Sequence, residues 1–121
     1  MKEKNILIVD DDEQILELLR EVLEEEGLIT DSASDGEEAL KKLEDGSYHL
    51  VISDIRMPGI DGFEVLQQVK EKYKKTKVIL MTGYTEEYDI SDALILGADD
   101  YITKPFDDSK VILAVKNVLK E

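Results

Sequence analysis

The chain has 121 residues, of which 42% are hydrophobic, enough for one domain with a real core and too few for two. It has no cysteine, which excludes a disulfide framework and a thiolate zinc site, and its net charge of −14 argues against direct binding of nucleic acid or anionic membranes. The amino terminus has no apolar signal region and no apolar run approaches a membrane span, so we expect a soluble cytoplasmic protein.

Strand and helix signals alternate from end to end. In chain order we expect a strand at 5–10, a helix at 13–26, a weak strand at 28–33, a helix from 34 to about 46, a strand at 49–53, a helix from 61 to about 73, a strand at 77–81, a helix at 86–97, a short strand at 100–103 and a helix ending near 120. These five βα units predict an α/β fold, a doubly wound parallel sheet with five helices. One domain would fill residues 1–121, with any output domain outside this chain.

Capping residues support three of the helix starts. Ser34 with Glu37 and Asp61 with Glu64 have the spacing of capping boxes, in which a side chain binds a free amide of the first turn. Asp107 or Asp108 is the candidate cap of the last helix.

Polar residues follow the apolar runs at the points where the strands end. They are Asp10 and Asp11, Asp54, Thr82, and Lys104 followed by Pro105. The carboxyl ends of parallel strands are where open α/β sheets build their sites, so we expect these side chains to share one pocket. Two carboxylates about 4 Å apart repel by about 4 kcal/mol at an effective dielectric near 20, so the cluster needs a cation or a lysine. Magnesium fits, because it prefers oxygen ligands and keeps several waters.

Each of these residues also has an ordinary structural reading. Asp10-Asp11-Asp12 could be a solvated acidic start of the first helix. Asp54 could cap a loop; however, it follows an apolar strand and precedes the rigid Met57-Pro58-Gly59 turn, where a carboxylate could attack phosphorus and form an aspartyl phosphate.

The later strand ends carry the same ambiguity. Thr82 could be a plain strand end or could bind a phosphoryl oxygen through its hydroxyl. Lys104 could be a solvated charge or a compact phosphate partner, and the turn into Pro105 favours a cis bond. Tyr101 could be strand packing or could move between buried and exposed rotamers. His49 is remote from the strand ends and is expected to be structural.

Together these residues resemble the receiver domain of two-component response regulators, over the whole chain. The resemblance rests on four fragments in order: Ile6-Leu7-Ile8-Val9-Asp10-Asp11, Asp54-Ile55-Arg56-Met57-Pro58-Gly59-Ile60-Asp61-Gly62, Met81-Thr82-Gly83-Tyr84 and Gly97-Ala98-Asp99-Asp100-Tyr101-Ile102-Thr103-Lys104-Pro105-Phe106. It implies a flavodoxin-like sheet of strand order 2-1-3-4-5. The pairing of the second and third fragments looks most like receivers attached to sigma-54-type activators or sensor-kinase hybrids.

The resemblance also implies roles for the pocket residues. A histidine kinase or phosphotransfer domain would phosphorylate Asp54. Magnesium would be held by the side chains of Asp11 and Asp54 and the carbonyl of Arg56, with Asp10 acting mainly through water. Thr82 and Lys104 would bind phosphoryl oxygens. Such a domain is not a conventional enzyme, but it would promote its own magnesium-dependent phosphotransfer and autodephosphorylation.

Two surfaces follow from the same resemblance. Thr82 and Tyr101 would couple phosphorylation to the face formed by the fourth helix, fifth strand and fifth helix, where an output domain or a second copy would bind. The kinase would dock on the first helix, at Gln14, Ile15 and Leu18, because a phosphohistidine must reach Asp54 in line. The alternative is that Ile15 and Leu18 are simply core residues.

Three other functions fit less well. A haloacid-dehalogenase-type phosphatase would need a second aspartate two residues after Asp54, where Arg56 stands. A dinucleotide-binding protein would need a glycine-rich first turn, which here is acidic. A docking module that works without phosphorylation would normally lack part of the acidic pair Asp10-Asp11, or Asp54, or Lys104. All of these residues are present.

Overall fold

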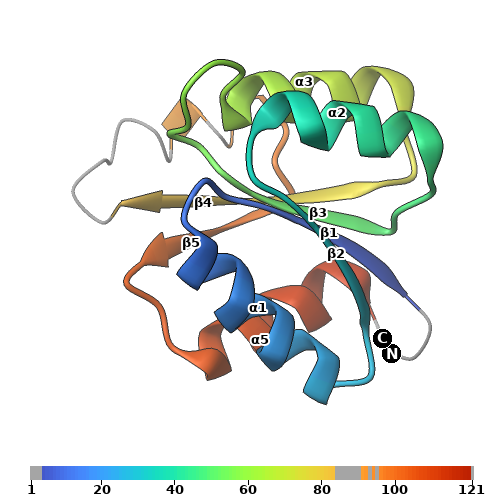
Figure 1. Cartoon of the computed structure of the whole chain (residues 1–121). Coiled ribbons are helices and arrows are strands. Elements are labelled where there is room, and N and C mark those ends of the chain that lie inside the picture. Colours follow the sequence, from blue (N-terminus) through green and yellow to red (C-terminus); the bar gives the residue numbers. More distant parts are fainter. Residues whose placement is uncertain (1–3, 84–90, 93, 95, 121) are drawn as a thin grey trace.

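Five parallel strands form one sheet in the computed structural model of the chain, which describes residues 4–83, 91, 92, 94 and 96–120 (Figure 1). The strands are β1 (Asn5–Val9), β2 (Ile29–Ala33), β3 (Leu50–Asp54), β4 (Lys77–Gly83) and β5 (Asp100–Lys104). Their order is β2-β1-β3-β4-β5, and each neighbouring pair is parallel. The predicted sheet and strand order are therefore confirmed.

Helices cover both faces of the sheet. They are α1 (Glu13–Glu25), α2 (Gly36–Asp45), α3 (Gly62–Lys72) and α5 (Asp108–Leu119). In Figure 1, α2 and α3 lie above the sheet and α1 and α5 lie below it. The described residues thus give four helices where five were predicted, because the helix expected at 86–97 falls largely outside them. None of the helices described has the length and apolar character needed to cross a membrane.

The sheet separates two hydrophobic cores. The core under α1 and α5 includes Ile6, Ile8, Ile52 and Ile79 from the strands, and the core under α2 and α3 includes Leu7, Val9, Val51 and Leu80. These strand residues have no exposed surface because both faces of the central strands are covered, as expected for unbroken apolar runs in parallel sheets. The two edge strands are less buried: β2 alternates exposed and partly buried residues, and β5 has one buried residue, Ile102.

The predicted caps agree with the structure except for that of α2. Asp61 caps α3 by accepting from the amide of Glu64, and Asp107 caps α5 by accepting from the amide of Lys110, each three residues further on. The α2 cap is Asp35, whose carboxylate accepts from Glu38, so the prediction of Ser34 with Glu37 is wrong by one residue. An aspartate caps at least as well as a serine, and this start places Gly36 where the chain is crowded.

Two glycines fix the loop between β3 and α3. A Cβ at Gly62 would lie 2.3 Å from the carbonyl oxygen of Asp54, and a Cβ at Gly36 would lie 2.4 Å from that of Ile60. The loop is therefore held between the end of β3 and the start of α2, with no room for a side chain at either contact. This packing fixes the backbone that carries Asp54.

We expect Gly62→Ala to destabilise the domain by about 2–3 kcal/mol, because the added methyl must displace backbone and not a flexible side chain. Chemical denaturation measures the change. Gly46→Ala is the matched control, since its Cβ would meet only ordinary contacts at 3.5–3.6 Å, and it should change stability by less than about 0.5 kcal/mol. Equal losses in the two variants would contradict the close approach at Gly62.

Candidate functional site

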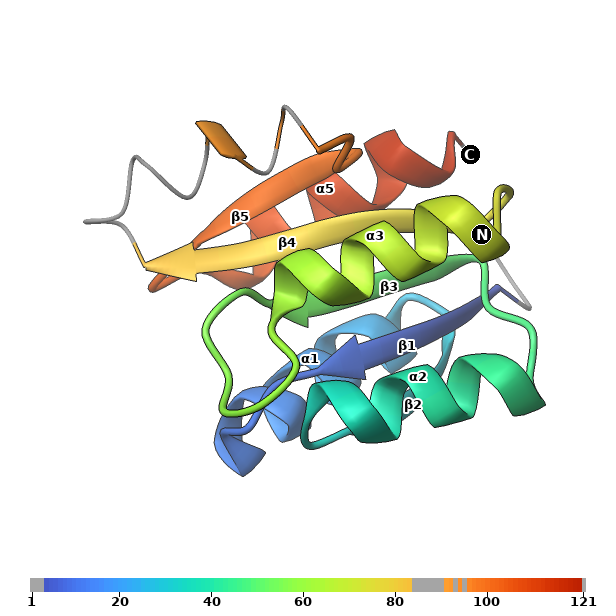
Figure 2. The same cartoon turned by 90° about the horizontal axis from the view of Figure 1, so that it is seen from above.

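The structure brings the predicted strand-end residues to one edge of the sheet. Asp10 follows β1, Asp54 ends β3, Thr82 lies near the end of β4 and Lys104 ends β5. The register pairs Val9 with Ser53, Asp54 with Met81 and Lys104 with Gly83, so the four positions lie within two residues of one another along the strands. Figure 2 shows the strand ends from above, with the arrowheads directed to the same side of the molecule.

One ammonium group joins two carboxylates at this edge. Lys104 Nζ lies 2.9 Å from Asp10 Oδ2 and 3.3 Å from Asp54 Oδ2. The Asp10 side chain is fully buried, and the Asp54 side chain retains 11% exposure. The lysine is thus part of the pocket and not a solvated charge, and Asp54 is the buried carboxylate that keeps an opening to solvent.

Asp10 is held on both of its oxygens. Its Oδ2 accepts from Lys104, and its Oδ1 accepts a 2.9 Å bond from the backbone amide of Asp12. Asp12 in turn caps α1 by accepting from the amide of Gln14. The acidic triplet is therefore divided: Asp12 is the helix cap of the structural reading, Asp10 is a buried pocket residue, and Asp11 is exposed beside them. With both oxygens engaged, Asp10 is better placed to act on a bound cation through water than directly.

Burial sets the electrostatics of the pocket. It raises the pKa of the Asp10 carboxyl, and burial together with the nearby charge of Asp10 raises the pKa of Asp54. Burial alone would disfavour the charged Lys104, but its bonds to the two carboxylates outweigh it and raise the lysine pKa. The ammonium therefore stays charged, while the carboxylates are ionised at a cost.

The same carboxylates could hold a divalent cation. One oxygen from each of Asp10, Asp11 and Asp54 lies within 4.8 Å of the others. This all-oxygen donor set, with one exposed member, suits magnesium, which keeps part of its water shell. Arg56 follows on the same loop; its backbone amide bonds to the Asp54 carboxylate and its side chain is exposed.

The two proposed switch residues occupy different environments. Thr82 is buried, and its hydroxyl donates a 3.2 Å bond to the carbonyl of Gly83. Tyr101 is 37% exposed and lines a shallow hollow with Leu113 of α5, which is 60% exposed. The Lys104-Pro105 bond is cis, as predicted.

The proposed docking residues are near the pocket but differ in exposure. Gln14 is exposed, and Leu18 is 38% exposed. Ile15 is partly buried and packs against the core beneath α1. Of the two apolar side chains, Leu18 is therefore the one that a partner could contact without disturbing the core.

Three contributors to the site were not identified from the sequence. The Asp12 amide orients Asp10, Gly62 packs on the Asp54 carbonyl, and the buried Ser53 hydroxyl donates to that same carbonyl at 3.0 Å. Glycine directly after the cap Asp61 was a usable signal, because a close approach often requires glycine. The other two contacts depend on backbone geometry that no spacing reveals.

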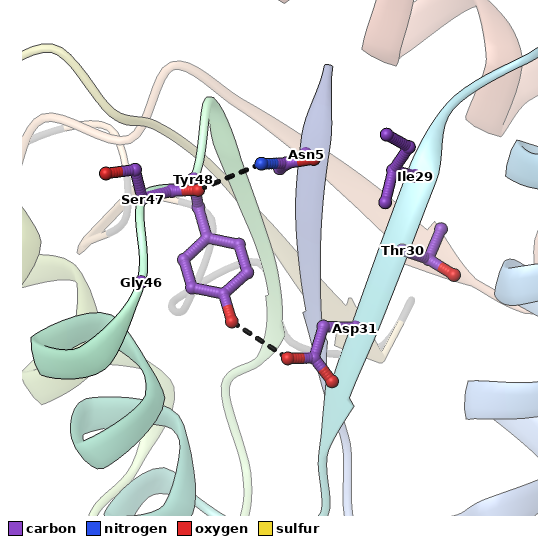
Figure 3. A pocket seen from close by; sticks show the side chains of 7 residues that line it. All are labelled: Asn5, Ile29, Thr30, Asp31, Gly46, Ser47 and Tyr48. Carbon is purple, nitrogen blue, oxygen red and sulfur yellow. Dashed lines mark hydrogen bonds between the residues drawn. The ribbon is translucent and has the colours of Figure 1, made fainter. Parts of the chain in front are cut away.

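A second hollow lies at the opposite end of the sheet, between the start of β2 and the residues before β3 (Figure 3). There Asp31 accepts bonds from the hydroxyl of Tyr48 at 2.9 Å and from Lys42 at 2.9 Å. Burial and the bond to Asp31 raise the pKa of Tyr48 to about 12, and Lys42 and Tyr48 help to lower that of Asp31. The phenol of Tyr48 therefore stays protonated and the carboxylate of Asp31 stays ionised beside Lys42, so neither group is suited to exchange protons near neutral pH. His49, nearby, accepts a bond from the Asn5 amide, in keeping with a structural role.

Comparison with known proteins gives a consistent result. The family profile described as "Response regulator receiver domain" matches residues 6–116. The chain is 44% identical over 117 residues to the alkaline phosphatase synthesis transcriptional regulatory protein PhoP of Bacillus subtilis, and 43% identical over 118 residues to the transcriptional regulatory protein ResD of the same organism. These matches cover 97% and 98% of this chain and 49% of each relative, so the chain spans about half the length of the relatives it matches.

Solved structures agree with the sequence matches. A putative response regulator from Chloroflexus aurantiacus superposes with a TM-score of 0.93 at 31% identity, covering 99% of this chain and 100% of the other. The chemotaxis protein CheY4 of Vibrio cholerae superposes with a TM-score of 0.87 at 29% identity, covering 95% and 98% of the two chains.

Proposed function

This chain belongs to the response regulator receiver domain family of two-component signalling, and we propose that Asp54 is its phosphoacceptor. The observation that supports this most directly is the Lys104 ammonium, held between the buried Asp10 and the slightly exposed Asp54. Asp54 is the buried carboxylate with an opening to solvent, and the Lys104 ammonium beside it would bind phosphoryl oxygens. The donor would be a phosphohistidine of a histidine kinase or phosphotransfer domain.

In the proposed step, a carboxylate oxygen of Asp54 forms a bond to phosphorus as the bond from phosphorus to the donor imidazole breaks. The leaving imidazole then takes a proton from solvent. Lys104 loses its ion pair with Asp54 when that carboxylate becomes an acyl phosphate, and its ammonium turns to a phosphoryl oxygen. Asp10 keeps the lysine stem in place through the 2.9 Å ion pair.

Magnesium, when bound, would neutralise phosphoryl charge in this pocket. The side chains of Asp11 and Asp54 and the carbonyl of Arg56 would bind it, with Asp10 acting through water.

The residual opening at Asp54 would also admit water to the acyl phosphate, and we propose that the domain catalyses its own slow dephosphorylation. Loss of label at equal rates in folded and urea-unfolded phosphoprotein would contradict that self-catalysis.

Asp54→Asn should abolish labelling by a small phosphodonor such as acetyl phosphate with magnesium, while the domain stays folded. Amide and carboxylate have nearly the same shape, but the amide is not a nucleophile toward phosphorus. Intact mass measures the adduct. Asp61→Asn is the matched control, because Asn also caps helices, and it should label normally. Undiminished labelling of Asp54→Asn would overturn the assignment.

Magnesium should stabilise the domain, by about 2.7 kcal/mol at a concentration near 100 times its Kd. Because the pKa values of Asp10 and Asp54 are raised in the folded state, ionisation of these carboxyls lowers the free energy of unfolding. This loss of stability is absent below the usual carboxyl pKa of 3.8 and is complete above the folded-state pKa. A cation that needs ionised carboxylates should therefore stabilise more as pH rises.

Thermal unfolding with and without magnesium, at constant ionic strength, measures this effect. Asp11→Ala should reduce it strongly, whereas Glu44→Ala, which removes another exposed charge, from α2, should not. A wild-type melting curve that magnesium leaves unmoved would show that the pocket is not a cation site.

We propose that the kinase docks on α1, at Gln14, Ile15 and Leu18. Leu18→Ala should slow transfer from a phosphorylated kinase about tenfold and leave both stability and acetyl phosphate labelling unchanged, because the side chain is 38% exposed. Leu113→Ala, which truncates an exposed leucine on α5, is the control. A Leu18→Ala variant with an unchanged transfer rate would exclude Leu18 from the interface.

We further propose that Thr82 and Tyr101 transmit phosphorylation to the face that includes β5 and α5. The helix predicted at 86–97, which was also expected on this face, lies largely outside the described residues. The Thr82 hydroxyl, now bonded to Gly83, would turn to a phosphoryl oxygen and free space into which the half-exposed Tyr101 could move. The exposed Leu113 lies on the same surface, where an output domain or a second copy would bind.

Structures with and without beryllofluoride, which mimics the aspartyl phosphate, test this switch. The Thr82 bond to Gly83 should be lost and the exposure of Tyr101 should fall from 37%. Thr82→Ala should still accept phosphate but leave Tyr101 exposed, and Thr82→Ser should behave like the wild type. Identical Thr82 and Tyr101 rotamers in the two states would rule out the mechanism.

A further inference from the structure

The positive charge of this acidic chain is concentrated in one short segment. Residues 70–77 hold five of its 15 cationic residues and a single glutamate, a net charge of +4. The rest of the chain therefore carries −18. The segment comprises the last turn of α3, the following turn and the first residue of β4. Below, it is called the lysine turn.

Most of this charge has no partner among the described residues. Lys70 binds Asp99 at 2.7 Å. Lys72, Lys74, Lys75 and Lys77 are exposed, and none of the ion pairs within the described part of the chain includes them. Cations in the last turn of a helix are explained by its dipole, which accounts for Lys70 and Lys72. Lys74, Lys75 and Lys77 come after the helix has ended and need another reason.

The backbone that carries these lysines is well anchored. The amide of Tyr73 donates to Val69 at 2.8 Å, and that of Thr76 donates to Tyr73 at 2.9 Å. The buried hydroxyl of Thr76 donates to the carbonyl of Tyr48 at 2.7 Å, and the amide of Lys77 donates to His49 at 3.0 Å. A partner would therefore lose little free energy in ordering the turn, although the lysine side chains must still be immobilised.

The lysine turn lies at the end of the sheet remote from Asp54. In Figure 2 it links the end of α3 to the start of β4, on the side opposite the strand arrowheads. A partner bound here would not compete with one bound at the acidic pocket.

We propose that the lysine turn is a docking surface for a short acidic segment of a partner polypeptide. The positive charge of the turn would attract the negative charge of the partner, and the negative charge of the remaining chain favours a partner small enough to contact the turn alone. A nucleic-acid duplex or an anionic bilayer extends far beyond the turn and would come within the Debye length, about 8–10 Å, of acidic surface. A short acidic segment can contact the turn alone, and a second copy, with a net charge of −14, would be repelled as a whole.

Fluorescence anisotropy tests the proposal with a short fluorescein-labelled peptide of glutamate and aspartate. The wild-type domain should bind this peptide at low ionic strength and release it as the salt concentration increases. It should not bind the matching peptide of glutamine and asparagine. Lys74→Glu with Lys75→Glu should weaken binding about tenfold or more. Lys41→Glu with Lys110→Glu is the control, because it makes the same change in net charge at two other exposed lysines.

Equal weakening in the two double variants would mean that only net charge matters and would overturn the proposal. So would absence of binding by the wild type, or tighter binding of a DNA duplex or of phosphatidylserine vesicles than of the acidic peptide. Acetyl phosphate labelling of Asp54 should be unchanged in both double variants, so this surface and the phosphoacceptor assignment succeed or fail separately.

Discussion

The ion pairs of Lys104 with Asp10 and Asp54 are the contacts on which the rest of the site depends. Two carboxylates at neighbouring strand ends are costly, and their pKa values are raised accordingly. One ammonium between them offsets part of that repulsion and links the ends of β1, β3 and β5 at this edge. With Asp11 included, three carboxylates and one ammonium leave a net charge of −2, which a single divalent cation neutralises.

That arrangement needs a rigid support, which the cores provide. The apolar residues of the central strands are buried on both faces, so the strand ends cannot move apart without opening two cores at once. The loop after Asp54 is held by Gly62 on one side and by Gly36 on the other. Packing of this kind leaves the carboxylate few alternatives, so a change in its charge or size must be accommodated by side chains at the rim, among them Thr82 and Lys104.

The sheet could be read from the sequence because buried parallel strands leave unbroken apolar runs, and polar residues directly after such runs must meet at one edge. The α2 cap was misplaced because Ser34 and Asp35 offer overlapping patterns, and the crowding of Gly36 against Ile60, which favours the later start, is a tertiary contact. Ile15 and Leu18 share a helix face in projection, yet only the structure shows that Ile15 packs on the core. Spacing thus predicts which residues share an edge or face, but not which hydrogen bonds they make there.

Charge also constrains the order of events at the pocket. A phosphoryl donor is anionic, and it approaches a chain of net charge −14 at the edge where three carboxylates gather. The lysine turn lies at the far end and, beyond a Debye length, lends little attraction there. Lys104 alone is already shared between two carboxylates. A cation held by these carboxylates would neutralise the pocket and favour the approach, so we expect the cation to bind before the phosphoryl donor.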